Sequence, residues 1–315
     1  MPSADGLTSD PSSGRLKRLV HWVGAALAVI AILFLLAQFN EHAGQISESQ
    51  FRDAWMRVLA AAFGYFVCGV PLGAIWWLTV RCSGQTEPPA WVCIQVHMAS
   101  QLGKYLPGNV AHFAARHWMM RNRGSENLGL IAAGLLEALV LVAAAALLAV
   151  AVLRPAVQIV LGWAIPPMLE LLLVLAGLIA VVAGWRYIRR RGWIDAALPA
   201  MQSVWMMLSA LIIAAVFFFG MTACFILVSG NFALPDFPTI VPWIAASWML
   251  GFLVPGAPGG IGVREFVLVL GLSPLSGEAP ALLDAALFRL VTIGGDALMA
   301  GAGLLFLRLE KRSGN

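Results

Sequence analysis

The sequence is short of charge, because Asp, Glu, Lys and Arg make up only 11% of its 315 residues and the formal net charge is +4. An ordinary soluble domain has roughly 25% charged residues. Hydrophobic residues reach 60%, and the mean hydropathy is +0.85. This composition excludes a soluble globular protein. It predicts an all-α protein that crosses a membrane several times, with no large soluble domain.

Cysteine is also scarce, and none of the four cysteines belongs to a CxxC pair. We therefore expect no disulfide framework and no zinc site. HExxH and GxSxG motifs are absent, and the glycines of GAPGGIG lack the βαβ context of a dinucleotide loop. No basic face with interleaved aromatics indicates nucleic acid. We expect no cofactor, no metal and no enzymatic activity.

Six apolar runs approach the roughly 20 residues that a membrane-spanning helix needs. They lie at residues 20–39, 57–80, 127–153, 167–186, 201–230 and 281–307. The first run is too long for a signal peptide and lacks a cleavage site, so we expect it to be retained. The predicted organisation is a disordered polar and then basic segment (1–19), one transmembrane domain (20–308) and a cytoplasmic tail (309–315).

The loop charges predict an orientation. Lys and Arg cluster before the first and third runs and after the fourth and sixth. If six spans alternate, these clusters share one side, which the positive-inside rule makes cytoplasmic. Both termini are then cytoplasmic, in a membrane of the bacterial inner-membrane type.

Two further apolar stretches, residues 88–122 and 238–272, are each broken by Pro-Gly near the middle. If either crossed the membrane once, the charged loops after it would change sides. We therefore predict two re-entrant hairpins. Broken backbone at membrane depth is tolerated only where protein or a watery cavity covers it, so both breaks should point into the protein.

The two hairpins share the pattern L-G-x3-P-G-x7-R, which starts at Leu102 and again at Leu250, an offset of 250 − 102 = 148 residues. A similar offset relates the first two apolar runs to the fourth and fifth. This predicts an inverted repeat with halves at about 20–153 and 167–307, a layout found in many transporters. Coincidence is the alternative, because the chain has 31 Gly and 17 Pro.

Ionisable residues inside a membrane are functional candidates, because burying their charge is costly. New half-helices after each break would offer free N–H groups, and arginines would add donors suited to an anionic head group. We predict a substrate-binding site formed by Lys104, Pro107, Gly108, Arg116, Glu137, Pro255, Gly256, Gly259, Gly260, Arg264, Glu265, Arg289 and Asp296.

Structural alternatives exist for several of these residues. Arg116 is placed so that it would end the first hairpin at the cytoplasmic surface, beside other arginines. Arg289 and Asp296 are seven residues apart on one helical face and form a candidate buried structural pair. In the functional interpretation, by contrast, Glu137, Glu265, Asp284 and Asp296 hold the cations while the substrate site is empty.

Four segments, KYLPGNVAHFAAR (104–116), LLEALV (135–140), VPGAPGGIGVREF (254–266) and ALFRLVTIGGDALMAG (286–301), resemble the lysylphosphatidylglycerol synthase transmembrane-region family of flippase-like proteins. The resemblance implies a lipid translocator. It does not imply aminoacyl transfer, because that activity belongs to a separate soluble domain, which we do not expect in a chain that ends at Asn315. Ala138 stands where many relatives have a basic residue, which argues against an ion-pair partner for Glu137 next to it in the sequence.

Three functions follow. The first is translocation of an anionic phospholipid or lipid-linked intermediate between leaflets. The second is a membrane-embedded enzyme that acts on a lipid head group, with Glu137, Glu265 or Asp296 as acid-base groups. The third is a non-transporting membrane partner of a lipid-modifying enzyme or glycosyltransferase.

Overall fold

The computed structural model describes residues 48–85, 88–106, 110–152, 200–255 and 257–313, together with scattered residues between 166 and 191. Within these ranges the chain is entirely helical, without strands. The α-helices are α2 (Glu48–Gly69), α3 (Leu72–Cys82), α4 (Ala90–Ser100), α5 (Ala111–Arg121), α6 (Asn127–Ala149), α9 (Ala200–Val228), α10 (Phe237–Leu253), α11 (Val263–Ser276) and α12 (Glu278–Ser313). Short 3₁₀ turns are η2 (Gln101–Tyr105), η3 (Val150–Val152), η4 (Leu234–Asp236) and η5 (Pro258–Gly260).

Five helical segments of the described chain are long and apolar enough to cross a membrane: Trp55–Cys82, Asn127–Val152, Met201–Val228, Pro258–Ser276 and Glu278–Glu310. Four of them coincide with predicted spans. Pro258–Ser276 belongs instead to a stretch that the sequence assigned to a hairpin. The predicted span 20–39 lies outside the described residues, and 167–186 lies almost wholly outside them.

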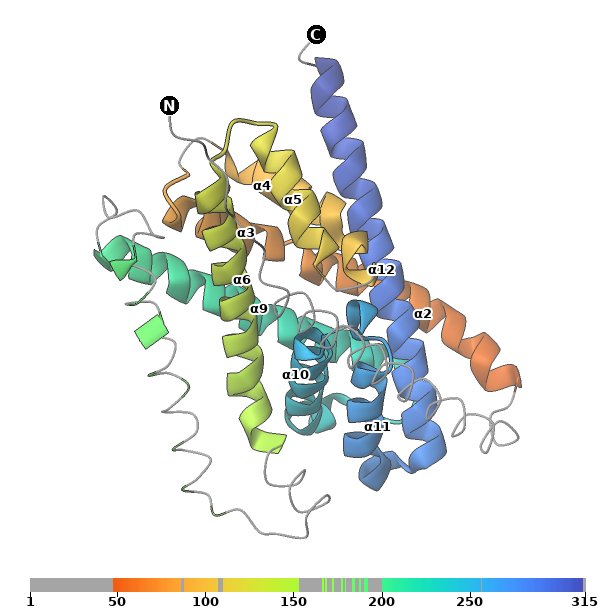
Figure 1. Ribbon diagram of the computed structural model, residues 1–315. Coiled ribbons are helices and arrows are strands. Elements are labelled where there is room, and N and C mark those ends of the chain that lie inside the picture. The colour runs from red at the N-terminus through yellow and green to blue at the C-terminus, as the bar shows by residue number, and fades with distance from the viewer. Residues whose placement is uncertain are drawn as a thin grey trace, which may run out of the picture.

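The helices pack around a core that is mainly apolar. α12 runs along the assembly and contacts α2, α4 and α11, while α6 and α9 pack against α10 (Figure 1). Phe218, Phe225 and Ile240 are completely buried at the centre. The outer faces are apolar too, with Leu128, Ile131 and many other large side chains exposed. An exposed apolar surface on this scale suits a lipid environment rather than water.

The predicted span 57–80 is not one continuous helix. α2 ends at Gly69 and α3 begins at Leu72, with a turn at Val70 and Pro71 between them. Proline has no backbone N–H and disturbs the helix at this point. Gly69 allows close packing here, because a Cβ atom at that position would lie 2.5 Å from the Met299 sulfur of α12. The predicted span therefore contains a turn, and Trp55–Cys82 as a whole is still long and apolar enough to cross a membrane.

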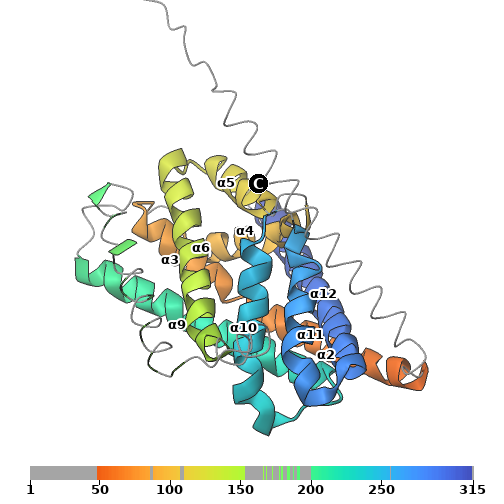
Figure 2. The ribbon, with the colours of Figure 1, turned by 60° about the horizontal axis from the view of Figure 1, so that its bottom comes forward.

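Both stretches with a predicted break consist of two helices with a break between them. The first contains α4, η2 and α5, and the second contains α10, η5 and α11. α10 and α11 contact each other and lie side by side in Figure 2. The two breaks also contact each other through η2 and η5. The fold therefore brings together two interrupted segments that are far apart in the sequence.

Candidate functional site

The second break is built from glycines with positive φ. Gly259, Gly260 and Gly262 have φ values of 58°, 74° and 84°, a region that side chains with a Cβ rarely adopt. α11 then begins at Val263. Its third residue, Glu265, accepts a hydrogen bond from the Gly262 N–H at 2.6 Å through Oε2. This is the reach-back half of a capping box, so the protein's own carboxylate already occupies this helix terminus.

The first break places two polar side chains against α12. Lys104 Nζ lies 2.7 Å from each carboxylate oxygen of Asp296. The Tyr105 hydroxyl donates a hydrogen bond to Asp296 Oδ2 at 2.6 Å. Asp296 is fully buried, and such a carboxylate is stable only when it is paired and hydrogen-bonded. The carboxylate thus connects η2 to the long helix.

Arg289, also on α12, holds the second break. Its Nη1 and Nη2 atoms each donate to the Gly259 carbonyl oxygen at 3.1 Å. Its Nε lies 3.2 Å from Glu265 Oε1 in an ion pair. The guanidinium carbon also lies 5.5 Å from the centre of the Tyr105 ring. Tyr105 in turn lies against Gly259, where an added Cβ would approach its ring to 2.7 Å. The two breaks therefore meet at Tyr105, Gly259 and Arg289.

Arg264 completes this group of residues. Its side chain lies against Gly251 and Gly260, where added Cβ atoms would come within 2.5 and 2.7 Å of it. Its guanidinium carbon lies 5.8 Å from the centre of the Trp248 ring. The buried Nε atom has no hydrogen-bond partner, and among the described residues no carboxylate forms an ion pair with this arginine.

We call Lys104, Tyr105, Arg264, Glu265, Arg289 and Asp296 the break cluster. Lys104 pairs with Asp296, and Arg289 pairs with Glu265. Arg264 interacts electrostatically with Arg289, Tyr105 and Asp296, but it adds a third cation to two carboxylates. The break cluster therefore carries one positive charge more than its own acids neutralise.

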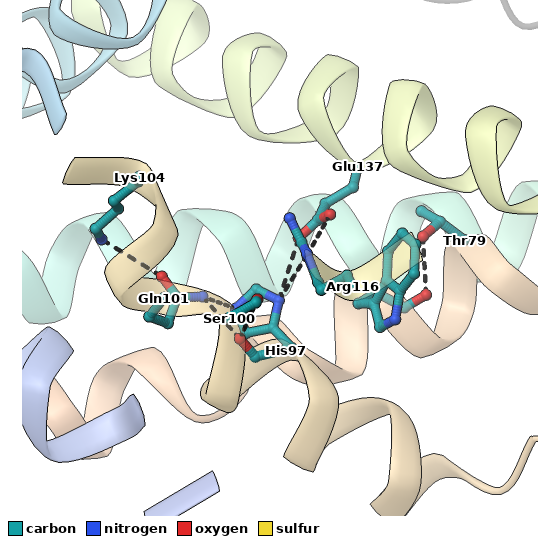
Figure 3. Close-up of polar contacts among 8 residues, drawn as sticks. Thr79, His97, Ser100, Gln101, Lys104, Arg116 and Glu137 are labelled. Carbon is teal, nitrogen blue, oxygen red and sulfur yellow. Dashed lines mark hydrogen bonds and ion pairs between the residues drawn. The ribbon is translucent and has the colours of Figure 1, made fainter. Parts of the chain in front are cut away.

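A second ionic group lies between α5 and α6, and its charged side chains are buried and paired with one another. Arg116 Nη1 donates to the two carboxylate oxygens of Glu137 at 2.7 and 2.6 Å. His97 Nδ1 lies 3.3 Å from Glu137 Oε1. Arg116 is 1% exposed and its guanidinium lies 4.9 Å from both the Trp76 and Phe113 ring centres. Figure 3 shows the contacts among Arg116, Glu137 and His97. We call Arg116, Glu137 and His97 the α5–α6 ion cluster.

Gln101 links the two clusters. Its Nε2 lies 2.7 Å from His97 Nε2, and its Oε1 accepts a hydrogen bond from Lys104 Nζ at 3.4 Å (Figure 3). His97 Nδ1 also lies 2.9 Å from Arg116 Nη1, so the ring contacts Arg116, Glu137 and Gln101 together. Polar contacts then run continuously from Glu137 on α6 to Asp296 on α12.

The structure divides the predicted site residues. Seven of them lie in or against the break cluster: Lys104, Gly259, Gly260, Arg264, Glu265, Arg289 and Asp296. Arg116 and Glu137 form a separate buried pair instead. Pro255 lies exposed in the turn after α10. Pro107, Gly108 and Gly256 lie outside the described residues.

Three sequence expectations need correction. Arg116 does not end the hairpin at a surface, because it is buried against Glu137. Arg289 and Asp296 do not pair with each other; each binds residues of a different break. Asp284 does not hold a cation through an ion pair. Its Oδ2 accepts hydrogen bonds from Ser229 at 2.6 Å and Asn231 at 3.0 Å.

Sequence reasoning missed Tyr105, His97 and Gln101. His97 lies against Glu137, and nothing in the sequence indicates that contact. His97 and Gln101 are four residues apart in an apolar stretch, so they share one helical face. That spacing was the available signal. No such signal pointed to Tyr105, whose partner Asp296 is 191 residues away.

The fold and the break cluster define a class: a helical integral membrane protein with charged residues gathered where two interrupted helical segments meet. The chain matches the family described as "Lysylphosphatidylglycerol synthase TM region" over residues 22–299. It belongs to that family. No curated protein and no solved structure matches the chain.

Proposed function

We propose that this protein translocates an anionic phospholipid or lipid-linked intermediate between the leaflets of a membrane. The observation that carries the proposal is Arg264, a partly buried guanidinium without a carboxylate partner among the described residues. A buried charge without a partner is costly. An anionic head group would compensate it, and a guanidinium matches the geometry of phosphate.

The neighbours of Arg264 suit an exchange of partners. Lys104 and Arg289 are held by Asp296 and Glu265. A phosphate that approaches Arg264 would also attract these two cations. Each carboxylate would then be partly released and would regain its cation when the lipid leaves. The site would therefore bind an anionic head group transiently. After the lipid leaves, Lys104 and Arg289 would again be paired with their carboxylates.

The layout supports alternating access. We propose that the two interrupted segments are re-entrant hairpins of an inverted repeat, which enter from opposite faces and meet near the midplane. The contact of Tyr105 and Arg289 with Gly259 supports this proposal. Each break would then close the path from one side of the membrane.

We further propose a membrane of the bacterial cytoplasmic type with both termini cytoplasmic, on the basis of the loop charges. We propose a transport role without covalent chemistry. A lipid-modifying enzyme or glycosyltransferase that supplies or consumes the lipid would be the partner. A fluorescent reporter fused after Asn315 tests the orientation, because an export-sensitive reporter fluoresces only on the cytoplasmic side.

The test of transport uses Arg264→Gln in proteoliposomes with fluorescent phosphatidylglycerol, where dithionite removes the signal of the outer leaflet. Wild type should make the inner-leaflet probe accessible, and Arg264→Gln should slow this exchange about tenfold or more, since a charge-assisted contact contributes about 1.5–3 kcal/mol. Arg308→Gln is the matched control, because Arg308 is exposed on α12. Equal exchange in a folded Arg264→Gln protein and wild type would contradict the assigned site.

A further inference from the structure

An apolar groove lies between α5 and α6 on the outside of the helix assembly. It encloses about 410 Å³, which is within the range of ligand pockets. The lining comes from α5, α6 and Trp76 of α3, and includes Val110, Phe113, Ile131 and Leu135. Val110, Ile131 and Leu135 are exposed, so the groove opens to the surroundings of the protein.

The shape follows from the sequence of α6. Gly134 and Ala138 are four residues apart and both line the groove, so they share one face of the helix. Small residues there leave space that α5 does not fill. The two helices are joined by the short turn at 122–126 and diverge from it, as Figure 2 shows.

The groove has a polar residue on the side nearest this turn, and a basic residue lies beyond it. His117 lines the groove, and its Nε2 contacts Asn127 Oδ1 at 3.0 Å. Arg121 follows one helical turn later, is exposed, and donates to the Ser125 carbonyl oxygen at 3.1 Å. That carbonyl does not neutralise its charge. An apolar groove with a cationic residue beyond it matches a phospholipid, whose acyl chain is apolar and whose phosphate is anionic.

The other end of the groove reaches the α5–α6 ion cluster. Ala138 and Trp76 line it. Ala138 follows Glu137 in the chain, and the Trp76 ring lies beside the Arg116 guanidinium. An occupant would keep water away from this buried pair, which strengthens its attraction.

We propose that this groove binds one acyl chain of an anionic phospholipid, with the phosphate near His117 and Arg121. The occupant is a lipid rather than a protein helix because the open face belongs to a membrane-spanning helix with exposed Leu128, Ile131 and Leu135. The site is separate from the break cluster. It would hold a lipid whether or not the protein transports one.

The test measures phospholipid retained by the full-length purified protein, using native mass spectrometry with phosphatidylglycerol or phosphatidylcholine of identical acyl chains. Gly134→Leu fills the groove, and its Cβ would lie at an ordinary 3.5 Å from Phe113 Cδ1. It should weaken binding of phosphatidylglycerol about tenfold, or roughly 1.4 kcal/mol. Gly301→Leu is the matched control, because no described atom lies within 4 Å of a Cβ there.

Arg121→Gln should weaken the binding of phosphatidylglycerol about fivefold and leave the binding of phosphatidylcholine unchanged. The reason is that one interfacial Arg contributes about 1 kcal/mol to the binding of an anionic lipid. Photoactivatable phosphatidylglycerol should crosslink wild type within residues 110–117 and 130–138, a readout that needs no variant. Equal retention by Gly134→Leu and Gly301→Leu, crosslinks confined to other helices, or loss of a dimer instead of a lipid on Gly134→Leu would each overturn the proposal. None of these outcomes depends on transport.

Discussion

The α5–α6 ion cluster and the break cluster contain similar residues but differ in charge balance and access. In the first, Arg116 and Glu137 neutralise each other, and both are at least 98% buried. In the second, three cations meet two carboxylates, and Arg264 is only partly buried. A closed, balanced pair stabilises a fold, whereas an accessible surplus charge suits a ligand. The comparison teaches that burial and balance separate structural ions from candidate site residues within one membrane protein.

The largest effect is expected when the closed pair is broken. Glu137→Gln leaves the Arg116 charge buried without a carboxylate, and breaking a buried pair costs about 3–5 kcal/mol. The free energy of unfolding, from a titration with sodium dodecyl sulfate in mixed micelles, should fall by that amount. Glu126→Gln is the control, because Glu126 is exposed at the start of α6. A loss below about 1 kcal/mol would show that the pair does not hold α5 to α6.

Tyr105→Phe tests the contact between the first break and α12. It removes a hydroxyl that donates to the Asp296 carboxylate at 2.6 Å, and hydrogen bonds to charged groups contribute about 1.5–3 kcal/mol. Stability in the same titration should decrease by that amount, with Tyr187→Phe as an exposed control. If both variants unfold alike, Asp296 does not depend on Tyr105.

Gly251→Ala tests whether Arg264 needs its close packing. The new Cβ would lie 2.5 Å from Arg264 Cγ and 3.2 Å from Gly260 Cα. To remove this steric clash, either the Arg264 side chain or the second break must move. Overpacking of this kind lowers the free energy of unfolding by about 1–3 kcal/mol. Thermal unfolding should detect the change. Gly301→Ala should have no such effect, since no described atom lies within 4 Å of its Cβ position.

The smallest effect, and the sharpest contrast, is expected for Arg264→Gln. Removing a surplus charge leaves no carboxylate unpaired, so stability should change by less than about 0.5 kcal/mol or rise. Arg116→Gln, measured in the same experiment, should destabilise the protein because it leaves the buried Glu137 carboxylate without its cation. A loss of stability in Arg264→Gln equal to that of Arg116→Gln would mean that both arginines are structural.

Much of this architecture was predictable from local sequence. The length of the apolar runs predicted the segments that correspond to α6, α9 and most of α12, because a helix satisfies its own backbone hydrogen bonds in lipid. The glycines and prolines predicted both interruptions. The intramembrane charges identified Lys104, Arg264, Glu265, Arg289 and Asp296 as a group worth considering together.

The pairing of those charges was not predictable in the same way. Spacing along one helix suggested that Arg289 and Asp296 form a pair, yet each faces a different break. Ala138 argued against a partner for Glu137 next to it in the sequence, but Arg116 reaches it from another helix. Such contacts depend on how helices cross, which helical periodicity does not encode.

The sequence by itself determined that this is a helical membrane protein with two interrupted segments, because hydropathy and glycine content act locally on the chain. Only the tertiary structure decided which charges neutralise one another. In the folded protein Arg116 pairs with Glu137, and Tyr105 packs against Gly259. Arg264 lies beside carboxylates that are already paired with other cations, so its charge is not neutralised by them. Charge balance depends on three-dimensional distances between helices, because Coulomb energies in a low-dielectric interior change steeply with separation.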